Sequence, residues 1–572
     1  MVRMDILAKF KEEVVEQLAS ATGINDIEGT LLVPKSREFG NLTTNICFML
    51  AKKTGRNPSE IAKELSKKIH ASEFISKVEA SGQYVNFFIN EKAYLNGVID
   101  SAMSESYGKG NKKEGKIIVE YSSPNIAKPF GVAHLRSTII GDSIYRCYDF
   151  LGYDCERVNH FGDWGTQFGK LITAYKKWGD DAKLREEPIK ECLNLYVKFH
   201  QEAEKDKMLE EEARAWFKKL EDGDNEAVKL WKYFKDLSIE NFKRIYAILG
   251  VSFDSYTGES FYATNALTKE VLSEAESKKV SSRDKDNSVI VNLEEDKLGI
   301  ALLVKSDGAS LYMTRDLAAA KYRWEHYRFL KNIYVVGADQ ELYFKQLFNV
   351  LKRLGNEWVD RCYHVKFGMI LSVDGGKMST RKGKVIFLED VLNKAVEEVE
   401  SIMRAKNPDM PSDEMKRIAR SVGIGAIKFA DLHEDRKRAI KFDWDHMFDA
   451  EGDTGPYIQY AFARTSKILS KSGTEISAER ATPSHADEIG LAYEIAKFPD
   501  VIIAAADKFE INAITNYLLV LCHSFSRFYE SCPIINAENE NSKALRLALT
   551  KATRNILKNG LYLLGMDALD NM

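Results

Sequence analysis

Short apolar segments alternate with stretches of helical periodicity through the middle of this chain, between residues 113 and 387. The apolar segments are KIIVEYS (116–122), DCERVNHFG (154–162), KNIYVVG (331–337) and HVKFGMIL (364–371). Such an alternation is typical of a doubly wound parallel sheet covered by helices, so it restricts this part of the chain to an α/β fold. Two stretches interrupt it, a charged helical one near 178–250 and a β-rich one near 254–310, and we expect both to be insertions.

The chain of 572 residues is too long for a single core, and its remaining parts differ in pattern. Residues 1–112 combine helical periodicity with a strand-like segment and end in the polar GKGNKKEGK, which is typical of a linker. Residues 388–450 are helical, and residues 451–572 have the apolar stripes of an all-α bundle. We therefore expect an N-terminal α+β domain, the α/β domain, a helical connecting region and a C-terminal helical bundle.

Composition narrows the class of protein. Hydrophobic residues make up 44% and charged residues 29%, and no apolar run is long enough to cross a bilayer, so we expect a soluble cytoplasmic protein. The seven cysteines are scattered without a C-x-x-C pair, which argues against a disulfide framework and a structural zinc site. The net charge of −3 provides no overall basic field, so a nucleic-acid partner has to bind local basic patches.

The segment SSPNIAKPFGVAHLRST (122–138) follows the first apolar run and leads into a helical pattern. It places His134 at a helix N-terminus beyond the carboxyl end of a strand, where open α/β sheets bind ligands and unpaired N–H groups favour phosphate. Glu120, Asn125 and Lys128 are expected to meet His134 at the same turn. Two interpretations are open at this point: a ligand site, or an ordinary loop in which the histidine caps the helix or packs against it.

A second segment, DGGKMSTRKGKV (374–385), joins paired glycines to a cluster of cations. A flexible loop of this composition can close over a polyphosphate and neutralise the charge that develops in a transition state. The alternative is a solvated basic loop, although Met378 and Ser379 between the cations are unusual for one.

These two segments resemble the HIGH and KMSKS signatures of class I aminoacyl-tRNA synthetases, and the surrounding sequence resembles the arginyl-tRNA synthetase family. Further segments similar to that family occur in its order: REFGNLTTNICFMLAKKTGRNPSEIA, NHFGDWGTQFGKL, LYMTRDLAAAKYR, HVKFGMI, GPYIQYAFAR and LLGMDALDNM. The resemblance covers nearly the whole chain and implies a Rossmann-like catalytic domain. It implies ATP-dependent ligation of L-arginine to tRNA(Arg) through an arginyl-adenylate, with Mg²⁺ required but no dedicated metal site in the protein. We further expect a monomer.

Binding a planar, permanently charged guanidinium requires carboxylates in fork geometry and flat packing. From the residues alone, Tyr312 is expected to close the strand ASLYM, and Asp316 is expected in the first turn of the helix that follows. The resemblance implies that Asp316, Tyr312 and Glu120 hold the side chain of the substrate. It implies that Asn125 and Gln340 hold its α-amino and carboxylate groups. The implied substrate set is Glu120, Ser122, Asn125, Tyr312, Asp316 and Gln340.

The resemblance also assigns residues to catalysis, to ATP and to tRNA. The implied catalytic residues are His134, Lys128, Lys377, Ser379 and Arg381. The implied ATP contacts are Gly131, Ala133, His134, Met369 and Met378. Aromatic and basic residues of the C-terminal bundle suit the stacking of unpaired anticodon bases, although most of these aromatic residues belong to the core. The candidates for tRNA contact are Tyr457, Tyr460, Arg464 and Arg554.

The chain departs from the family pattern at several positions. The HIGH segment reads GVAH (131–134), whereas the family normally begins with histidine and has glycine third. Losing one transition-state donor commonly costs ~10²–10³-fold in rate, and a methyl clash adds roughly 1–3 kcal/mol. Thr380 replaces the second lysine of KMSKS, for which Lys128 is expected to substitute, and Phe462 replaces a histidine in the C-terminal bundle. Two alternatives to an active ligase stay open: a tRNA-binding relative with weakened or lost catalysis, and another class I synthetase.

Overall fold

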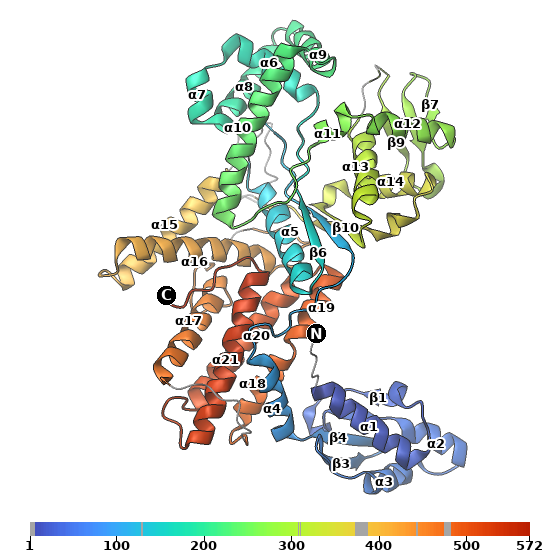
Figure 1. The fold of residues 1–572 in the computed structure, drawn as a ribbon, viewed down its shortest axis with the longest axis vertical. Coiled ribbons are helices and arrows are strands. Elements are labelled where there is room, and N and C mark those ends of the chain that lie inside the picture. Colours follow the sequence, from blue (N-terminus) through green and yellow to red (C-terminus); the bar gives the residue numbers. More distant parts are fainter. Residues whose placement is uncertain are drawn as a thin grey trace.

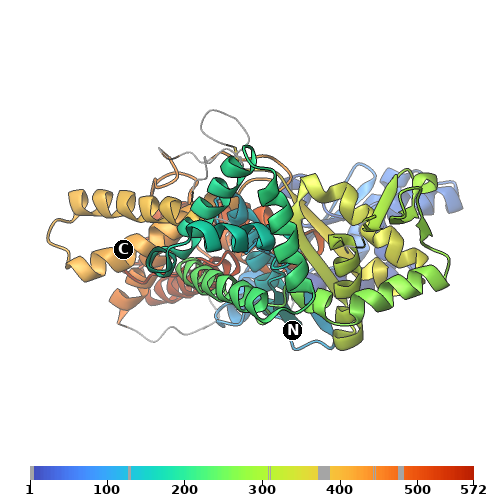
Figure 2. The same cartoon turned by 90° about the horizontal axis from the view of Figure 1, so that it is seen from above.

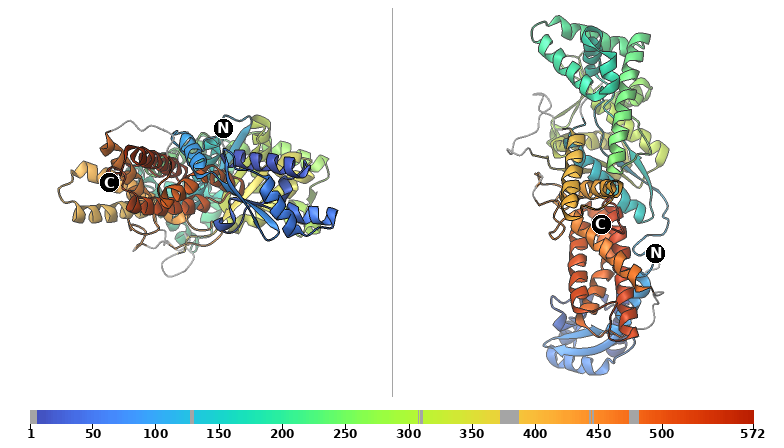
Figure 3. Two further views of the ribbon diagram at one scale, coloured as in Figure 1. Left: turned by 90° about the horizontal axis from the view of Figure 1, so that it is seen from below. Right: turned by 90° about the vertical axis from the view of Figure 1, so that its left-hand side faces the viewer.

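The structure is a computed structural model, and it describes residues 6–126, 130–306, 308, 311–371, 387–441, 444, 446–473 and 482–572. The molecule is elongated, as Figure 1 and the right-hand view of Figure 3 show. A small N-terminal α+β unit lies at one end, and an inserted helical unit lies at the other. A parallel sheet and the C-terminal helices lie between them.

The central sheet is parallel and contains β5 (Lys116–Glu120), β6 (Asp154–Val158), β10 (Lys331–Gly337) and β11 (Cys362–Phe367), in the order β11-β10-β5-β6. Ile117 and Val119 of β5 point into a core shared with α5 (Ala133–Phe150). Ile118 points into the opposite core, shared with α13 (Tyr312–Tyr327) and α14 (Glu341–Arg353). Because both faces are buried, the strands are almost continuously apolar, which makes them recognisable in the sequence. The predicted parallel α/β sheet is confirmed.

The order of the strands reverses between β5 and β10. From β5 the chain passes through α5 to β6 on one side, while the neighbour on the other side of β5 is β10. The loops that leave the carboxyl ends of these two strands run to opposite faces of the sheet, and ligands bind in the crevice between them. The residues that follow β5, β6 and β10 are therefore the ones placed to form a site.

The predicted helical insertion near 178–250 consists of α7 (Asp181–Glu186), α8 (Pro188–Ala203), α9 (Met208–Glu221) and α10 (Asn225–Leu249), and α6 (Thr166–Trp178), which precedes it, packs against α8 and α9. Its helices bury apolar residues at helical spacing, as Phe234, Phe242 and Leu249 of α10 illustrate. The predicted β-rich insertion begins with α11 (Glu259–Thr264) and α12 (Leu267–Ser277), followed by the antiparallel β7 (Ser282–Arg283), β8 (Val289–Asn292) and β9 (Ile300–Val304). Both insertions border the same end of the sheet (Figure 2).

One local prediction in the second insertion is wrong. Tyr312 does not close a strand, because β9 ends at Val304 and Tyr312 is the first residue of α13. The hydroxyl of Thr314 donates to the carbonyl of Leu303 (2.7 Å), which ties the start of α13 to β9. Asp316 then lies beyond the first turn of α13. Because they are four positions apart on one helix, Tyr312 and Asp316 lie on the same face.

The N-terminal unit contains α1 (Ile6–Thr22), α2 (Ile46–Thr54), α3 (Pro58–Lys68) and an antiparallel sheet of order β1-β2-β4-β3. The strands are β1 (Leu31–Leu32), β2 (Leu42–Thr44), β3 (Ile75–Ser81) and β4 (Tyr84–Ile89). Phe10, Val14 and Leu18 of α1 are buried at helical spacing. The helix α4 (Glu91–Ala102) follows β4 and packs against the C-terminal helices α18 (Ala486–Ala496) and α21 (Glu540–Leu563) before the chain enters the central sheet. The predicted α+β character of this region is confirmed.

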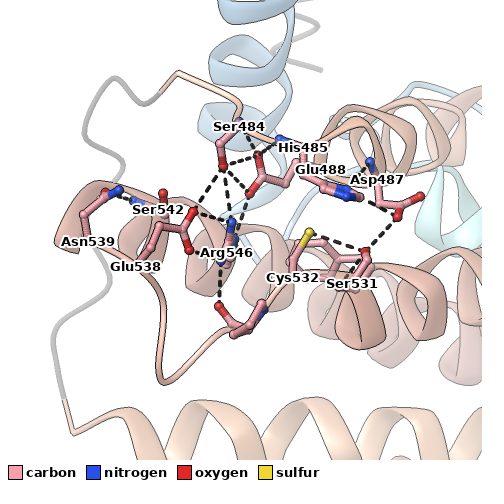
Figure 4. A network of polar contacts seen from close by, with 12 residues as sticks. Ser484, His485, Asp487, Glu488, Ser531, Cys532, Glu538, Asn539, Ser542 and Arg546 are labelled. Atoms are coloured by element: carbon pink, nitrogen blue, oxygen red, sulfur yellow. Dashed lines mark hydrogen bonds and ion pairs between the residues drawn. The ribbon is translucent and has the colours of Figure 1, made fainter.

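The chain after the sheet is helical, with α15 (Leu388–Lys406), α16 (Ser412–Leu432), α17 (Gly455–Ser472), α18 (Ala486–Ala496), α19 (Phe498–Lys508), α20 (Asn512–Ser531) and α21 (Glu540–Leu563). Figure 4 shows a polar network that joins several of these helices. Arg546 of α21 donates to Glu488 of α18 and to Glu538, each at 2.8 Å. Glu488 is fully buried, so this pairing compensates a charge that is costly to bury alone. No helix in the described part of the chain combines the length and apolar content needed to cross a membrane.

Candidate active site

A cavity of about 600 Å³ lies at the carboxyl ends of β5 and β10, where the strand order reverses. It is lined by residues that the sequence predicted for substrate binding: Glu120 at the end of β5, Asn125 in the next loop, Tyr312 and Asp316 on α13, and Gln340 in the turn η4 (Ala338–Gln340). Side chains from both insertions complete the wall. The fold thus brings together five residues from distant parts of the sequence.

The loop that follows β5 has an unusual backbone. Ser122 and Ser123 have positive φ values of 68° and 44°, which are uncommon for residues other than glycine and cluster at functional sites. The amide of Ser122 donates to Ser137 Oγ (2.9 Å), and its hydroxyl lies 2.7 Å from the hydroxyl of Tyr246. Ser122 is not among the residues that line the cavity. It is buried beneath the loop, where it holds this backbone against α5 and α10.

The side chain of Asn125 lies directly over Gly162 of the NHFGDWG segment. A methyl group at Gly162 would approach Asn125 Oδ1 to 2.3 Å, so this position of the amide requires glycine there. The backbones of the two loops also pair, since Ile126 donates to the carbonyl of Gly162 and Gly162 donates to the carbonyl of Pro124, each at 3.2 Å. The loops after β5 and β6 therefore form one rigid wall of the cavity.

Asp163 anchors the loop after β6 to the first insertion and to α11. It is fully buried and accepts hydrogen bonds from the amide and the hydroxyl of Ser260 (2.8 and 2.6 Å). It also pairs with Lys235 of α10 at 2.6 Å. This anchorage fixes the backbone that carries His160, a further residue of the cavity wall.

In the described part of the chain, three carboxylates of the cavity have a cationic partner. The pairs are Glu120 with Arg323 (2.5 Å), Glu259 with Arg315 (2.9 Å), and Asp316 Oδ1 with His160 Nε2 (3.4 Å). Tyr343 of α14 also donates its hydroxyl to Asp316. The two guanidinium groups stay charged at any accessible pH, whereas an imidazole can lose its proton.

The pKa values of the cavity groups follow from burial and from these pairs. Burial lowers the pKa of His160, but the hydrogen bond to Asp316 and the charges of Glu120 and Asp316 outweigh it and raise the pKa to about 9. Burial, reinforced by the charge of Asp316, holds the pKa of Tyr343 well above its usual value. Burial also raises the pKa of Glu259, against the opposing effect of Arg315. At neutral pH the cavity therefore holds two carboxylates paired with the guanidinium groups of Arg315 and Arg323, and an imidazolium at His160 beside Asp316.

His134 lies in the first turn of α5, where the sequence predicted a helix N-terminus. Its ring stacks on Phe130, with centroids 5.3 Å apart. The backbone of Gly131 pairs with Phe387, the residue just before α15. Ala133, the first residue of α5, is exposed. The HIGH-like segment therefore contacts Phe387, which follows the KMSKS-like segment in the sequence.

Other residues predicted for ATP contact and catalysis are only partly described. Met369 is 44% exposed after β11, and its carbonyl accepts from the amide of Ile440 (3.0 Å). Lys128, Lys377, Met378, Ser379 and Arg381 lie outside the described residues. A second cavity of about 840 Å³ lies beside Phe130 and Phe387, between α8, α10 and α15. None of the residues predicted to bind the substrate lines this second cavity. The smaller cavity is therefore the better candidate for the substrate site.

The predicted tRNA residues of α17 differ in exposure. Tyr460 is 44% exposed, and Tyr457 is half-buried. The guanidinium of Arg464 lies over the ring of Tyr529 on α20, 4.3 Å from its centroid. Exposed aromatic and basic groups therefore occur together on the surface formed by α17 and α20.

Arg554 of α21 has a different environment. It pairs with Asp570 near the end of the chain (2.8 Å), and its guanidinium lies over the ring of Phe462, 4.8 Å from the centroid. Phe462 itself is buried in the bundle. The ring of Phe462 therefore provides a packing surface for the guanidinium of Arg554 within the bundle.

His160, Tyr343 and Glu259 also line the cavity but were not predicted from the sequence. His160 follows β6 and Tyr343 follows the turn after β10, so their place beyond the carboxyl end of a parallel strand is a signal that could have found them. Glu259 lies in an insertion, and nothing in its neighbourhood indicates where that insertion folds back.

Family models match almost the whole chain. Residues 99–444 match the catalytic domain of class I (R) tRNA synthetases, residues 458–572 match the DALR anticodon binding domain, and residues 8–89 match the arginyl tRNA synthetase N-terminal domain. The arginine–tRNA ligase of Clostridium kluyveri is 45% identical over 574 residues, covering 98% of this chain and all of the relative. That of Halothermothrix orenii is 42% identical with the same coverage.

Comparison with solved structures indicates the same family. The arginyl-tRNA synthetase of Plasmodium falciparum has a TM-score of 0.79 at 26% identity and covers 99% of both chains. The Thermus thermophilus arginyl-tRNA synthetase has a TM-score of 0.78 at 24% identity, covers both chains completely and shares the fold. The cavity chemistry, the two signature segments and these full-length matches lead to one conclusion. The chain belongs to the arginyl-tRNA synthetase family of the class I aminoacyl-tRNA synthetases.

Proposed function

We propose that this protein ligates L-arginine to tRNA(Arg) in two steps, first forming arginyl-adenylate from arginine and ATP and then esterifying the terminal ribose of the tRNA. The single observation that carries the proposal is the cavity in which Glu120, Tyr312 and Asp316 lie with Asn125 and Gln340. Carboxylates can receive the fork of a guanidinium, and the ring of Tyr312 offers a flat surface. The two amides are suited to hold the α-amino and carboxylate end.

Adenylate formation needs no nucleophile from the protein. The arginine carboxylate attacks the α-phosphorus of ATP and pyrophosphate leaves, so catalysis consists of alignment and charge neutralisation. The rigid wall formed by Asn125 and Gly162 suits alignment, because it fixes the substrate end of the cavity. His134 at the N-terminus of α5 is suited to bind phosphate, together with Lys128, Lys377, Ser379 and Arg381. Gly131, Ala133, Met369 and Met378 are assigned to the rest of ATP.

Mg²⁺ is proposed as a companion of ATP. Within the described residues no cluster of three or more histidine, cysteine or acidic side chains is arranged to hold a metal ion. In this proposal the ion is held by the phosphates of ATP, where it neutralises their charge. The protein residues align the two reactants and supply the cationic side chains around the phosphates.

We assign the remaining parts of the chain to tRNA. In this assignment residues 1–112 and 388–450 contact the body of the tRNA, residues 113–387 carry catalysis, and residues 451–572 bind the anticodon. The proposed active form is a monomer. The seven cysteines are unpaired, which supports a reducing compartment such as the cytoplasm.

The experiment that tests the function is pyrophosphate exchange with the full chain. We expect exchange that depends on arginine and is strongest when tRNA(Arg) is present, and thermal stabilisation by arginine but not by the other amino acids. No exchange with folded protein and cognate tRNA would contradict catalysis and favour an inactive tRNA-binding relative. Stabilisation by another amino acid alone would indicate a different class I synthetase.

The departures in the HIGH segment give a second prediction. In the double variant Gly131→His, Ala133→Gly we expect little change in the exchange rate, because Ala133 is exposed and Gly131 is already part of the pairing with Phe387. The single variant Ala133→Gly separates the methyl group from the imidazole. A gain of about 10²–10³-fold, the effect of restoring a lost transition-state donor, would instead show that catalysis has been weakened in this chain.

Binding of the anticodon loop gives a third prediction. We expect Tyr460→Ala to weaken tRNA binding about tenfold or more, because stacking of a base on an exposed aromatic ring is worth about 1–3 kcal/mol. Fluorescence anisotropy with labelled tRNA(Arg) measures the affinity. Tyr460→Phe keeps the ring and is the matched control, for which we expect the parent affinity. Equal affinity of the alanine variant would remove Tyr460 from the binding surface.

A further inference from the structure

Both ring nitrogens of His160 face oxygen atoms. Nδ1 lies 3.1 Å from the backbone carbonyl of Thr257, and Nε2 lies 3.4 Å from Oδ1 of Asp316. A carbonyl and a carboxylate can only accept hydrogen bonds, and a neutral imidazole has only one N–H to donate. Nδ1 is within hydrogen-bond distance of its carbonyl, whereas Nε2 is in ion-pair range of Asp316 without a hydrogen-bond partner of good geometry among the described residues; an imidazolium, with a proton on each nitrogen, suits both neighbours. A neutral ring protonated at Nδ1 would instead leave the lone pair of Nε2 beside a carboxylate oxygen.

Charged and phenolic groups from several elements face His160. They are Glu120 on β5, Glu259 and Tyr262 on α11, Arg315, Asp316 and Arg323 on α13, and Tyr343 on α14. Arg323 and Arg315 neutralise Glu120 and Glu259 with charges that cannot be removed. Asp316 pairs with His160, the one cation of this set whose proton can be released.

The substrate introduces a second cation at the same carboxylate. In the proposed function Asp316 receives the guanidinium of arginine, and both of its oxygens are already engaged, Oδ1 with His160 and Oδ2 with the hydroxyl of Tyr343. A guanidinium on Asp316 would lie beside the imidazolium in a buried cavity, where repulsion between like charges is strong. The repulsion is relieved if the imidazolium gives up one of its two protons. A neutral His160 can keep its hydrogen bond to Thr257 through Nδ1.

We propose that His160 is a positioning residue that holds a proton beside Asp316 in the empty cavity and releases it to solvent when L-arginine binds. This inference rests on the proposed function. The balance is one guanidinium bound for one proton released, so the net charge of the cavity does not change. His160 then holds Asp316 in place for the substrate without competing with it as a cation.

The raised pKa of His160, about 9, means that the empty cavity is protonated throughout the physiological range. A bound guanidinium opposes the charged form and lowers this pKa. Between the pKa of the arginine-bound form and about 9, linkage requires the dissociation constant for arginine to fall about tenfold for each unit of rising pH. The affinity for arginine should therefore increase from pH 6 to pH 8.

The test is calorimetric titration of the full chain with L-arginine at pH 7.5 in phosphate and in Tris, two buffers with different enthalpies of ionisation. The dependence of the observed heat on the buffer counts the protons released. We expect a value near one for the parent. Binding of arginine with the same heat in both buffers would overturn the inference, and so would a dissociation constant that is flat from pH 6 to pH 8.

A matched pair of variants assigns the proton. His160→Gln can still donate an amide N–H towards Asp316 but cannot titrate, so we expect its proton count to fall to near zero and its pH dependence to flatten. His326→Gln is the matched control. Nδ1 of His326 also lies close to a backbone carbonyl, that of Tyr322 (2.8 Å), but His326 is exposed and lies outside the cavity. Release of a full proton by folded His160→Gln would overturn the assignment.

The same titrations separate this inference from the proposed function. If arginine produces no binding in either buffer, with or without tRNA, the proposed function fails and the proton inference fails with it. If arginine binds and supports pyrophosphate exchange without releasing a proton, the proposed function stands and only the role of His160 is overturned. Should the glutamine variant not fold, the two measurements on the parent still decide the inference.

Discussion

Replacing Asp316 by asparagine is expected to lower kcat/KM for arginine at least about 10²-fold, which is the effect of leaving a buried charge without its partner. Asp316 faces the cavity with only 24% of its side chain exposed, so water cannot replace the carboxylate as the partner of a guanidinium. Asparagine has nearly the same shape and can still accept the hydrogen bond from Tyr343. Steady-state exchange kinetics with varied arginine measure the effect.

The matched control for this variant is Glu325→Gln, which removes an exposed carboxylate from the same helix. We expect it to behave as the parent enzyme. Thermal unfolding of both variants establishes that they are folded. If Asp316→Asn is folded and retains the parent kcat/KM, Asp316 does not bind the substrate side chain, and the proposed orientation of arginine in the cavity is wrong.

Replacing Arg136 by methionine should give the largest loss of stability, about 3–5 kcal/mol. Arg136 on α5 pairs with Asp431 on α16 at 3.0 Å, and both side chains are fully buried. Its guanidinium also donates to the backbone carbonyls of Gly368 (2.8 Å) and Arg438 (2.6 Å). The variant leaves a carboxylate and two carbonyls without this partner in the interior. Urea unfolding of the full chain, followed by circular dichroism, measures the change.

The loss should depend on pH with a sign that the pKa of Asp431 determines. Burial raises this pKa to about 6, even though the charge of Arg136 opposes the effect. Without Arg136 the pKa rises further, and the folded state binds a proton that the unfolded state does not hold. Stability of the variant then falls as pH rises, so its deficit should be smaller at pH 5 than at pH 8.

Two further variants serve as controls for this prediction. Arg404→Met breaks an exposed pair with Glu400 on α15 and should cost less than about 0.5 kcal/mol. The double variant Arg136→Met, Asp431→Leu removes both charges and should recover much of the lost stability. If Arg136→Met unfolds at the same urea midpoint as the parent, this pair does not stabilise the contact between α5 and α16.

The parallel sheet could be predicted because its strands are buried on both faces. Ile117, Ile118 and Val119 are consecutive apolar residues that pack into two different cores, and such a run is visible in any single sequence. The start of α5 was predicted for a similar reason, since its apolar residues recur at helical spacing. Local signals of this kind do not require knowledge of what each residue contacts.

The start of α13 could not be predicted in the same way. The segment ASLYM is apolar and follows a strand-rich stretch, so it favours a strand by local preference. In the structure the hydroxyl of Thr314 donates to the carbonyl of Leu303 on β9. This contact holds the first turn of α13, so the helix begins at Tyr312, two residues before Thr314. Tertiary contacts therefore override the local preference at Tyr312.

The sequence by itself, through its resemblance to the arginyl-tRNA synthetase family, predicted a set of residues that line one cavity: Glu120, Asn125, Asp316 and Gln340. Only the tertiary structure decided how these residues are charged and paired. The contacts of Asp316 with His160 and Tyr343 join three segments that leave different strands, and no local pattern encodes such pairs. The physical reason is that a pKa depends on burial and on neighbouring charges, and both exist only once the chain has folded.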